Sequence, residues 1–232
     1  TPVFVDFAAG KKGSLMVEGT ENLIPPGRFD FATWSKGAGI ASVSATEDTY
    51  WDYPVYQVVA KADGDPDYTF VRLDYLQIPL TIAIDEQYTA TFYVKKLNHS
   101  FVGFRVFNAS EMGKTHAVLN LDTGEVQANI SVLKIKATIV GGGWWRVTVT
   151  NMGLTATSGY VGICLPDDMD GAENPPCNGQ GVYWAGLLQL EKKPYDTPFQ
   201  IGTRANSRMQ ITLPQALPEE WGIGVTFKLL HL

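Results

Sequence analysis

The sequence has 232 residues, of which 18% are charged and 12% aromatic, with 23 glycines, 13 prolines and a formal net charge of −6. This composition is typical of strand-and-turn proteins and argues against a mainly helical chain. The acidic charge, without a long basic run, excludes the positive footprint that nucleic-acid binding needs. No apolar stretch approaches the roughly 18–20 residues of a membrane helix, so we expect neither nucleic acid nor a membrane as a partner.

Segments with the pattern of β-strands recur along the whole chain, bounded by Gly, Pro, Asp or Asn. In 88–96, alternate residues from Tyr88 to Val94 are apolar and those from Thr89 to Lys95 are more polar, which predicts one buried and one wetter face. The strand-like segments are 2–7, 13–18, 55–61, 68–75, 88–96, 101–108, 116–122, 131–140, 144–150, 159–165 and 181–191. They predict an all-β fold, an antiparallel β-sandwich of the jelly-roll type with short strand-containing arms at both ends.

The chain divides into three regions. Residues 1–24 form an N-terminal arm, 25–203 carry the jelly roll, and 204–232 form a C-terminal arm or the start of a second β unit. The chain begins at Thr1 rather than at Met, and we expect that it was processed or is a piece of a longer polypeptide.

Two adjacent tryptophans stand where the glycine run 141–143 becomes a strand. Neighbouring side chains of a strand point to opposite faces, so one ring enters the core and the other faces outward. If Trp145 is the core residue, it shares its face with Val147 and Val149, and Trp144 lies with Arg146 on the other face. That other face is either a sugar groove or the contact with a neighbouring strand or arm.

Five stretches, in this order, resemble the carbohydrate-binding-module-like jelly roll of bacteriophage tail-fibre, tailspike and head-decoration proteins. They are GSLMVEGTENLIPPGRFDFATWSKG (13–37), YTATFYVKK (88–96), LNLDTGEV (119–126), GGGWWRVTVT (141–150) and GVYWAGLLQLEKKPYDTPFQIGT (181–203). Two features depart from the family pattern: Ala185, which stands between Trp184 and Gly186, and the insertion DDMDGAENPPC at 167–177. The resemblance implies a domain that binds rather than cleaves glycans.

Aromatic side chains are the first candidates for a sugar site, because aromatic faces pack against the apolar C–H faces of pyranoses. The strongest are Trp51 and Tyr53, since EDTYWDYP (47–54) reads as an exposed turn. The alternative is that such rings fill the core of the sandwich. The further candidates are Trp144 or Trp145, Tyr183 or Trp184, and the strand residues Arg72 and Arg105 as groove residues.

Arg146 directly follows the tryptophan pair and has two interpretations. It could hold the carboxylate of an acidic glycan. Alternatively its stem lies on the sheet and its guanidinium pairs with a carboxylate such as Glu191; the resemblance also implies this pairing, and we favour this structural interpretation.

The insertion at 167–177 raises the questions of a metal site and of a disulfide. Asp167, Asp168 and Asp170, with Glu173, supply the carboxylates of an irregular Ca²⁺ loop, and the alternative is a solvated polar turn. The flanking pair, Cys164 and Cys177, has a spacing that suits a loop-closing disulfide, which would contribute about 3 kcal/mol, and the alternative is two thiols. Two cysteines and three scattered histidines argue against zinc.

Catalytic motifs are lacking: the sequence has no Gly-x-Ser-x-Gly elbow, phosphate-binding glycine loop or His-Glu-x-x-His. Paired carboxylates for glycoside hydrolysis would come from Glu18, Glu21, Asp74 and Glu191. Because the resembling domains bind glycans, we expect a protein that is not an enzyme.

These observations predict a virion protein, made in the bacterial host cytoplasm, that displays a glycan-binding jelly roll on a fibre, spike or capsid surface for host attachment. Its expected partners are a host-surface or environmental glycan and other virion proteins, without a cofactor except for the Ca²⁺ option. Fibre proteins are commonly trimeric, and the fold leaves edge strands to be covered, so we expect a homo-oligomer such as a trimer. The alternative is a capsid-cement or tail-connector protein without a sugar ligand, in which the arms dock.

Overall fold

The computed structural model describes residues 12–17, 20–74, 83, 85–106, 117–129, 132–152, 160–172, 174–197, 199, 203–204 and 207–212. For 12–17, 73–74, 152, 204 and 207–212 this description covers the backbone alone. The chain forms two compact units, one of residues 20–204 and the other of residues 1–19 and 205–232. No helix in the described ranges is long and apolar enough to span a bilayer.

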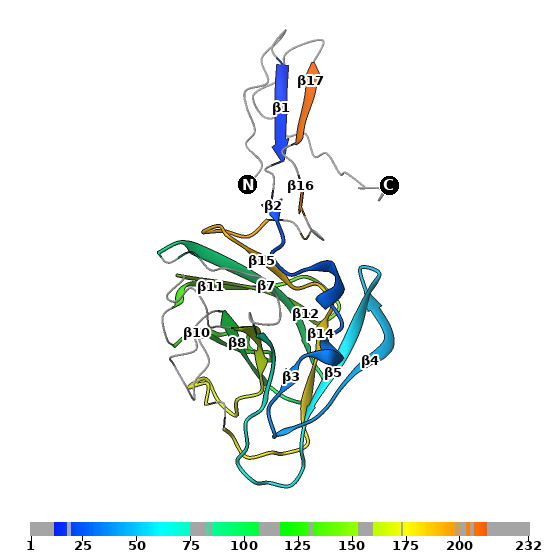
Figure 1. The fold of residues 1–232 in the computed structure, drawn as a ribbon, viewed down its shortest axis with the longest axis vertical. Helices are drawn as coiled ribbons and strands as arrows, with labels where there is room; N and C mark the ends of the chain where they lie inside the picture. The colour runs from blue at the N-terminus through cyan, green and yellow to red at the C-terminus, as the bar shows by residue number, and fades with distance from the viewer. Residues whose placement is uncertain are drawn as a thin grey trace. The chain divides into compact units, whose positions relative to one another are not determined.

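The larger unit is a sandwich of two antiparallel sheets (Figure 1). One sheet has the strand order β10 (Val126–Ala128), β9 (Ala117–Asn120), β8 (Phe101–Val106), β13 (Tyr160–Cys164), β6 (Phe70–Asp74) and β3 (Ser35–Lys36). The other has the order β11 (Val132–Ile139), β12 (Trp144–Met152), β7 (Gln87–Lys96), β14 (Gly181–Ala185), β5 (Tyr53–Ala60) and β4 (Ile40–Tyr50), and β15 (Gln189–Glu191) also pairs with β7. The predicted all-β sandwich is confirmed.

The core lies between the two sheets, where alternate residues of facing strands meet. Two single-turn 3-10 helices, η1 (Pro26–Arg28) and η2 (Phe31–Thr33), precede the sheets and insert an aromatic ring into this core. Phe31 stacks on Trp184 of β14 with the ring centroids 3.9 Å apart, and Trp34 meets the same indole edge-on at 5.3 Å. Trp184 therefore stands at the centre of the core.

Strand β7 shows both the success and the limit of the alternating pattern. Tyr88, Ala90, Phe92 and Val94 all face the core, as the sequence predicts. The opposite face was expected to be wetter, yet Thr89, Thr91 and Tyr93 are buried as well. Segments from elsewhere in the chain cover them: Thr89 Oγ1 donates a hydrogen bond to the carbonyl of Lys193 (2.8 Å), and the rings of Tyr50 and Trp51 contact Tyr93. Of this outer set, only Lys95 is partly exposed.

Residues 20–24 belong to the sandwich rather than to a terminal arm. The backbone amide of Leu23 donates to the carbonyl of Leu190 (2.8 Å), and Asn22 Nδ2 donates to the carbonyl of Leu188 (3.0 Å). Ile24 is fully buried in the core. The larger unit accordingly begins at Thr20.

The two ends of the chain contribute paired strands. In the smaller unit, β1 (Lys12–Val17) and β17 (Ser207–Thr212) form an antiparallel ribbon whose register runs from Lys12 opposite Thr212 to Val17 opposite Ser207. In the larger unit, β2 (Thr20–Glu21) pairs with β16 (Thr203–Arg204). In each unit, a strand from the N-terminal end of the sequence thus pairs with a strand from the C-terminal end.

The additional residue at Ala185 is accommodated by a bulge between β14 and β15. Both strands pair with β7, but five residue steps from Trp184 to Gln189 match only three steps on β7. The chain between them turns aside, and the Gly186 amide donates to the carbonyl of Pro54 (2.8 Å). A bulge inserts residues without disturbing the ladder on either side, so Ala185 and the residues that follow it leave the sheet intact.

Candidate functional site

The tip of the β4–β5 hairpin carries an exposed tryptophan in a strained backbone conformation. Tyr50 and Tyr53 pair directly, so Trp51 and Asp52 form a two-residue turn. Their φ angles are 52° and 66°, as in a type I′ turn, which Asn and Gly adopt far more readily than Trp. Such residues cost on the order of 1–3 kcal/mol and concentrate at functional sites. Trp51 is nevertheless 60% exposed, so this strain holds a large ring at the surface.

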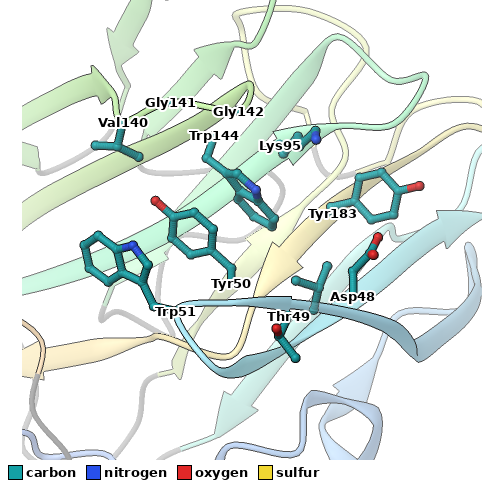
Figure 2. A pocket seen from close by; sticks show the side chains of 11 residues that line it. Asp48, Thr49, Tyr50, Trp51, Lys95, Val140, Gly141, Gly142, Trp144 and Tyr183 are labelled. Carbon is teal, nitrogen blue, oxygen red and sulfur yellow. The ribbon is translucent and has the colours of Figure 1, made fainter.

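Neighbouring rings fix the position of Trp51. It stacks on Tyr50 with centroids 5.3 Å apart and planes inclined by 14°, and it contacts Tyr93 of β7 at 5.6 Å. Tyr50 in turn lies 4.7 Å from the ring of Trp144 in β12 (Figure 2). Because β7 and β12 lie beyond β14 in the sheet order, the hairpin tip reaches across the outer face of the seven-stranded sheet.

A pocket of about 500 Å³ opens beside these rings (Figure 2). Small-molecule sites have volumes of roughly 300–1,000 Å³ and combine apolar walls with a few polar groups. This pocket has that composition, with aromatic rings on one side and Lys95, Tyr183 and Asp48 on the other. Its lining residues are Asp48, Thr49, Tyr50, Trp51, Val55, Lys95, Val140, Gly141, Gly142, Trp144 and Tyr183.

The two adjacent tryptophans divide between core and pocket. Trp145 packs against the core together with Val147 and Val149, and its Nε1 donates to the carbonyl of Leu121 (3.3 Å). Trp144 points to the opposite face, where it is only 8% exposed but lines the pocket. The predicted division of the pair is confirmed, and the outward face is a pocket wall.

Three consecutive glycines form the loop that borders this wall. Gly141, Gly142 and Gly143 have φ angles of 96°, 59° and 78°, a left-handed run that L-residues adopt only with strain. The loop closes through the Trp144 amide, which donates to the carbonyl of Gly141 (3.0 Å). The glycines therefore allow a tight β11–β12 connection that leaves room at the mouth of the pocket.

Two tyrosines under the hairpin tip have perturbed acidities. Burial raises the pKa of Tyr50, and the proximity of Tyr93 raises it further. Burial also raises the pKa of Tyr93, although the guanidinium of Arg146 acts in the opposite direction. Both phenols are therefore neutral at physiological pH, and this wall of the pocket carries no charge of its own.

Arg146 is a structural residue beneath the pocket. Its Nε donates to the hydroxyl of Tyr93 (3.1 Å), and its Nη2 forms an ion pair with Asp196. The structural interpretation of Arg146 is therefore confirmed, but its carboxylate partner is Asp196 and not the expected Glu191. Glu191 is fully buried and accepts hydrogen bonds from Thr20 Oγ1 and from the Thr197 amide (3.0 Å) and hydroxyl (2.6 Å). The sequence could not distinguish the two carboxylates, because the segment after β15 turns Asp196 back over the sheet.

Two of the predicted aromatic platforms do not reach the pocket. Trp184 has no exposed surface, because its side of β14 faces the core, so the prediction of a sugar-binding ring is wrong there. The adjacent Tyr183 faces the pocket instead. Tyr53 is half-buried, packs edge-on against Phe199 at 5.1 Å and does not line the pocket.

Arg72 and Arg105 belong to the six-stranded sheet, so they cannot share a groove with Trp51 and Trp144. They flank Gly162, which lies opposite both in the ladders. Their guanidinium carbons lie 4.1 and 4.9 Å from the ring centroid of Tyr160, an arrangement that suits cation–π attraction. The two arginines thus pack around an aromatic ring on the other layer.

The described part of the acidic loop has the contacts of a polar turn. Within the described residues, no group of three or more His, Cys, Asp or Glu side chains converges, so the Ca²⁺ option for Asp167, Asp168 and Asp170 has no support there. Asp168 Oδ1 instead accepts a hydrogen bond from the Asp170 amide (2.8 Å), as in an ordinary polar turn. Burial raises the pKa of Asp167. Glu173 lies outside the described residues.

Cys164 and Cys177 are buried thiols that are not joined in a disulfide, so the disulfide option is wrong. Burial raises the pKa of Cys177, which keeps that thiol protonated and unreactive. Of the carboxylates considered for catalysis, Glu191 is held in buried hydrogen bonds. Glu21 has an exposed side chain, and its backbone pairs with Thr203 of β16. Glu18 and the Asp74 side chain lie outside the described part of the chain.

Sequence reasoning missed several pocket residues, above all Tyr50, Asp48 and Lys95. Tyr50 and Asp48 could have been found from the sequence, because they are close to Trp51 in the same predicted turn. Lys95 was placed on the correct face of its strand, but nothing in the sequence indicates that a distant hairpin folds toward it.

Comparisons with known proteins give limited similarity. No family model matches the sequence, and no curated protein matches it. Among solved structures, the chain is similar to a carbohydrate-binding module, CBM6cm-2 from Cellvibrio mixtus lichenase 5A, in complex with cellotriose. The identity is 15%, the match covers 77% of this chain and 98% of that chain, and the TM-score is 0.36.

Proposed function

We propose that this protein binds glycans in the pocket beside Trp51. The observation that carries the proposal is the exposed indole, held in a strained turn and stacked on Tyr50 at the rim of a pocket. A ring fixed in this way has lost its conformational freedom before a ligand arrives, which favours binding.

The chemistry of the pocket suits a saccharide. The faces of Trp51 and Trp144 can pack against the apolar C–H faces of sugar rings, while Asp48, Lys95 and the Tyr183 hydroxyl can exchange hydrogen bonds with hydroxyl groups. Purely apolar ligands would leave these polar groups unpaired and lose affinity accordingly.

Binding rather than cleavage is the activity that we propose. Glycoside hydrolysis needs two carboxyl groups that flank the scissile bond. Among the pocket-lining residues, all of which the structure describes, Asp48 is the only carboxylate. The pocket thus supplies one hydrogen-bonding acid but not the acid–base pair.

The placement on a bacteriophage virion, on a fibre, spike or capsid surface, is part of the proposal and is supported by the sequence resemblance alone. Display in several copies, as in a homo-oligomer such as a trimer, would raise the avidity of individually weak sites by multivalency. Host attachment is the role that such an arrangement serves.

A structural role as capsid cement or tail connector is the second candidate. The observation in its favour is the separate unit that the two ends form around the β1–β17 ribbon, since an attachment module would have this construction. On this view the Trp51 pocket would have no saccharide ligand, and the two candidates are separated by the same experiment.

The test is a glycan-array screen of the purified full chain, of Trp51→Ala and of Tyr68→Ala. Tyr68 is another exposed aromatic ring, 44% exposed, and does not line the pocket, so it is a matched control. We expect the wild type and Tyr68→Ala to bind the same glycans, and Trp51→Ala to lose this binding while remaining folded. An empty array for the folded wild type would reject glycan binding and favour the structural role, and binding that survives in Trp51→Ala would place the site elsewhere.

A further inference from the structure

Lys95 is the positively charged residue of the pocket. It lies directly opposite Trp144 on one neighbouring strand and opposite Tyr183 on the other. Its stem also runs along the glycine loop, since a Cβ added at Gly143 would lie 3.5 Å from Lys95 Cε. Trp144, Tyr183 and the glycine loop therefore border Lys95, whose ammonium group lies on the polar side of the pocket (Figure 2).

This ammonium group has no partner among the described residues. The adjacent Lys96, on the opposite face of the strand, forms an ion pair with Asp122 (2.7 Å) and a hydrogen bond with Ser100 (3.1 Å). Lys95 forms neither kind of contact within the described part of the chain, and Asp48, across the pocket, does not pair with it. The partly exposed ammonium group thus has no internal acceptor among the described residues, so an external anion can reach it without displacing one.

We propose that Lys95 selects saccharides that carry a negatively charged group, which it binds while the sugar ring packs on Trp144 and Trp51. This inference rests on the proposed glycan-binding function and names its ligand class. A charge-assisted hydrogen bond between ammonium and an anionic group is about twice as strong as a neutral one.

Asp48 limits how much negative charge the pocket accepts. Its carboxylate lines the same pocket, and the chain as a whole has a net charge of −6. A saccharide with charges on every ring would bring like charges close to Asp48, whereas one isolated charge can lie at Lys95 while neutral hydroxyls donate to Asp48. The ligand is therefore a glycan with a single charged residue among neutral ones.

The charged group can be a carboxylate or a sulfate ester. Lysine acts as a compact point charge and lacks the planar fork with which arginine favours one geometry of anion. Both are anionic substituents on a pyranose, and an array that carries carboxylated and sulfated glycans distinguishes them.

The experiment uses an array with neutral, uronate-containing, sialylated and sulfated glycans, followed by titration calorimetry with the strongest soluble hit and its uncharged counterpart. Lys95→Met keeps the apolar stem and removes the charge. Lys136→Met, at an exposed position of β11 outside the pocket, is the matched control for a lost charge. We expect the wild type to bind the charged glycan at least about tenfold more tightly, and Lys95→Met to lose that preference but retain binding to the neutral counterpart.

The outcomes separate this inference from the function on which it rests. Hits that are exclusively neutral, or a charge preference that persists in Lys95→Met, would overturn the role of Lys95 and leave glycan binding standing. An array without hits for the folded protein would reject glycan binding itself. A preference lost also in Lys136→Met would show that the overall charge, rather than the pocket, attracts the ligand.

Discussion

Trp51 lies nearly parallel to Tyr50, the residue that precedes it, with the ring centroids 5.3 Å apart. Consecutive residues of an extended strand point to opposite faces, so this stacking requires the left-handed backbone of the turn, where φ of Trp51 is 52°. The turn thus serves two purposes, since it reverses the chain and places two rings on one side. The pocket wall depends on a local backbone conformation rather than on an extended strand.

The turn can be relaxed without removing its aromatic ring. Asp52, the second turn residue, also has a positive φ, and glycine is the favoured residue at this position of a type I′ turn. We expect Asp52→Gly to raise the free energy of unfolding by about 0.5–1 kcal/mol, measured by urea denaturation, while glycan binding is retained. Ser44→Gly, at an exposed position of β4 that pairs regularly with Gln57, is the control and should destabilise, because glycine weakens a strand. A loss of stability in Asp52→Gly would show that the turn is not strained.

The buried phenols predict a loss of stability at alkaline pH. Burial raises the pKa of Tyr50 in the folded state above its unfolded value near 10, so the stability present below about pH 10 is lost as the pH rises through the folded pKa. Tyr50→Phe removes this titration together with a buried hydroxyl that has no partner among the described residues. We expect Tyr50→Phe to match the wild type at pH 7 and to lose less stability between pH 10 and 11, as measured by thermal melts. Identical alkaline profiles would contradict the assignment.

The ion pair between Arg146 and Asp196 predicts a measurable coupling. Both side chains are mostly buried, and Arg146 also donates to Tyr93, so removal of one partner leaves a charge poorly solvated. A double-mutant cycle with Arg146→Met and Asp196→Asn should give a coupling energy of about 1–3 kcal/mol by chemical denaturation. The pair Lys192 and Glu86, which is well exposed, is the control and should give less than about 1 kcal/mol. Equal couplings would indicate that the Arg146 pair is as hydrated as a surface pair.

Gly162 is a position where the fold tolerates no side chain. A Cβ at this site would overlap the carbonyl oxygen of Val71 and lie 2.7 Å from Arg72 Cα, both backbone atoms of a neighbouring strand. We expect Gly162→Ala to lower the free energy of unfolding by about 2–3 kcal/mol or to prevent folding. Gly27→Ala, where a Cβ would meet no atom within 4 Å, should change stability little. Similar melting temperatures for both variants would contradict this packing.

The strand content and the division of Trp144 and Trp145 followed from side-chain alternation, because a period of two is a local property of the chain. Strand β4 was missed because its sequence, from Ser42 to Thr49, is polar and lacks an alternating apolar set. It is an edge strand with largely exposed side chains, so burial left no pattern in its sequence. The exposed turn at Trp51 was nevertheless predicted correctly from its polar and aromatic residues.

The composition of the pocket could not be predicted, because it depends on which segments meet across the sheet. Lys95 and Tyr183 are 88 positions apart and become neighbours only through the register of β7 and β14. Whether Tyr183 or Trp184 faces the pocket likewise depends on which face of β14 meets the core. Both aromatic side chains suit a core position, so the sequence does not distinguish them. Glu191 and Asp196 differ in partner only because of the turn after β15.

The mouth of the pocket is built from two hairpin connections, the turn at Trp51–Asp52 and the glycine loop 141–143, each joining strands that are consecutive in the chain. Substitutions, insertions or exchanges in such connections leave the hydrogen-bonded ladders untouched. Changes in these two connections would therefore alter the pocket while the sandwich stays intact. The same two connections are where libraries should be randomised to redirect this scaffold to new saccharides.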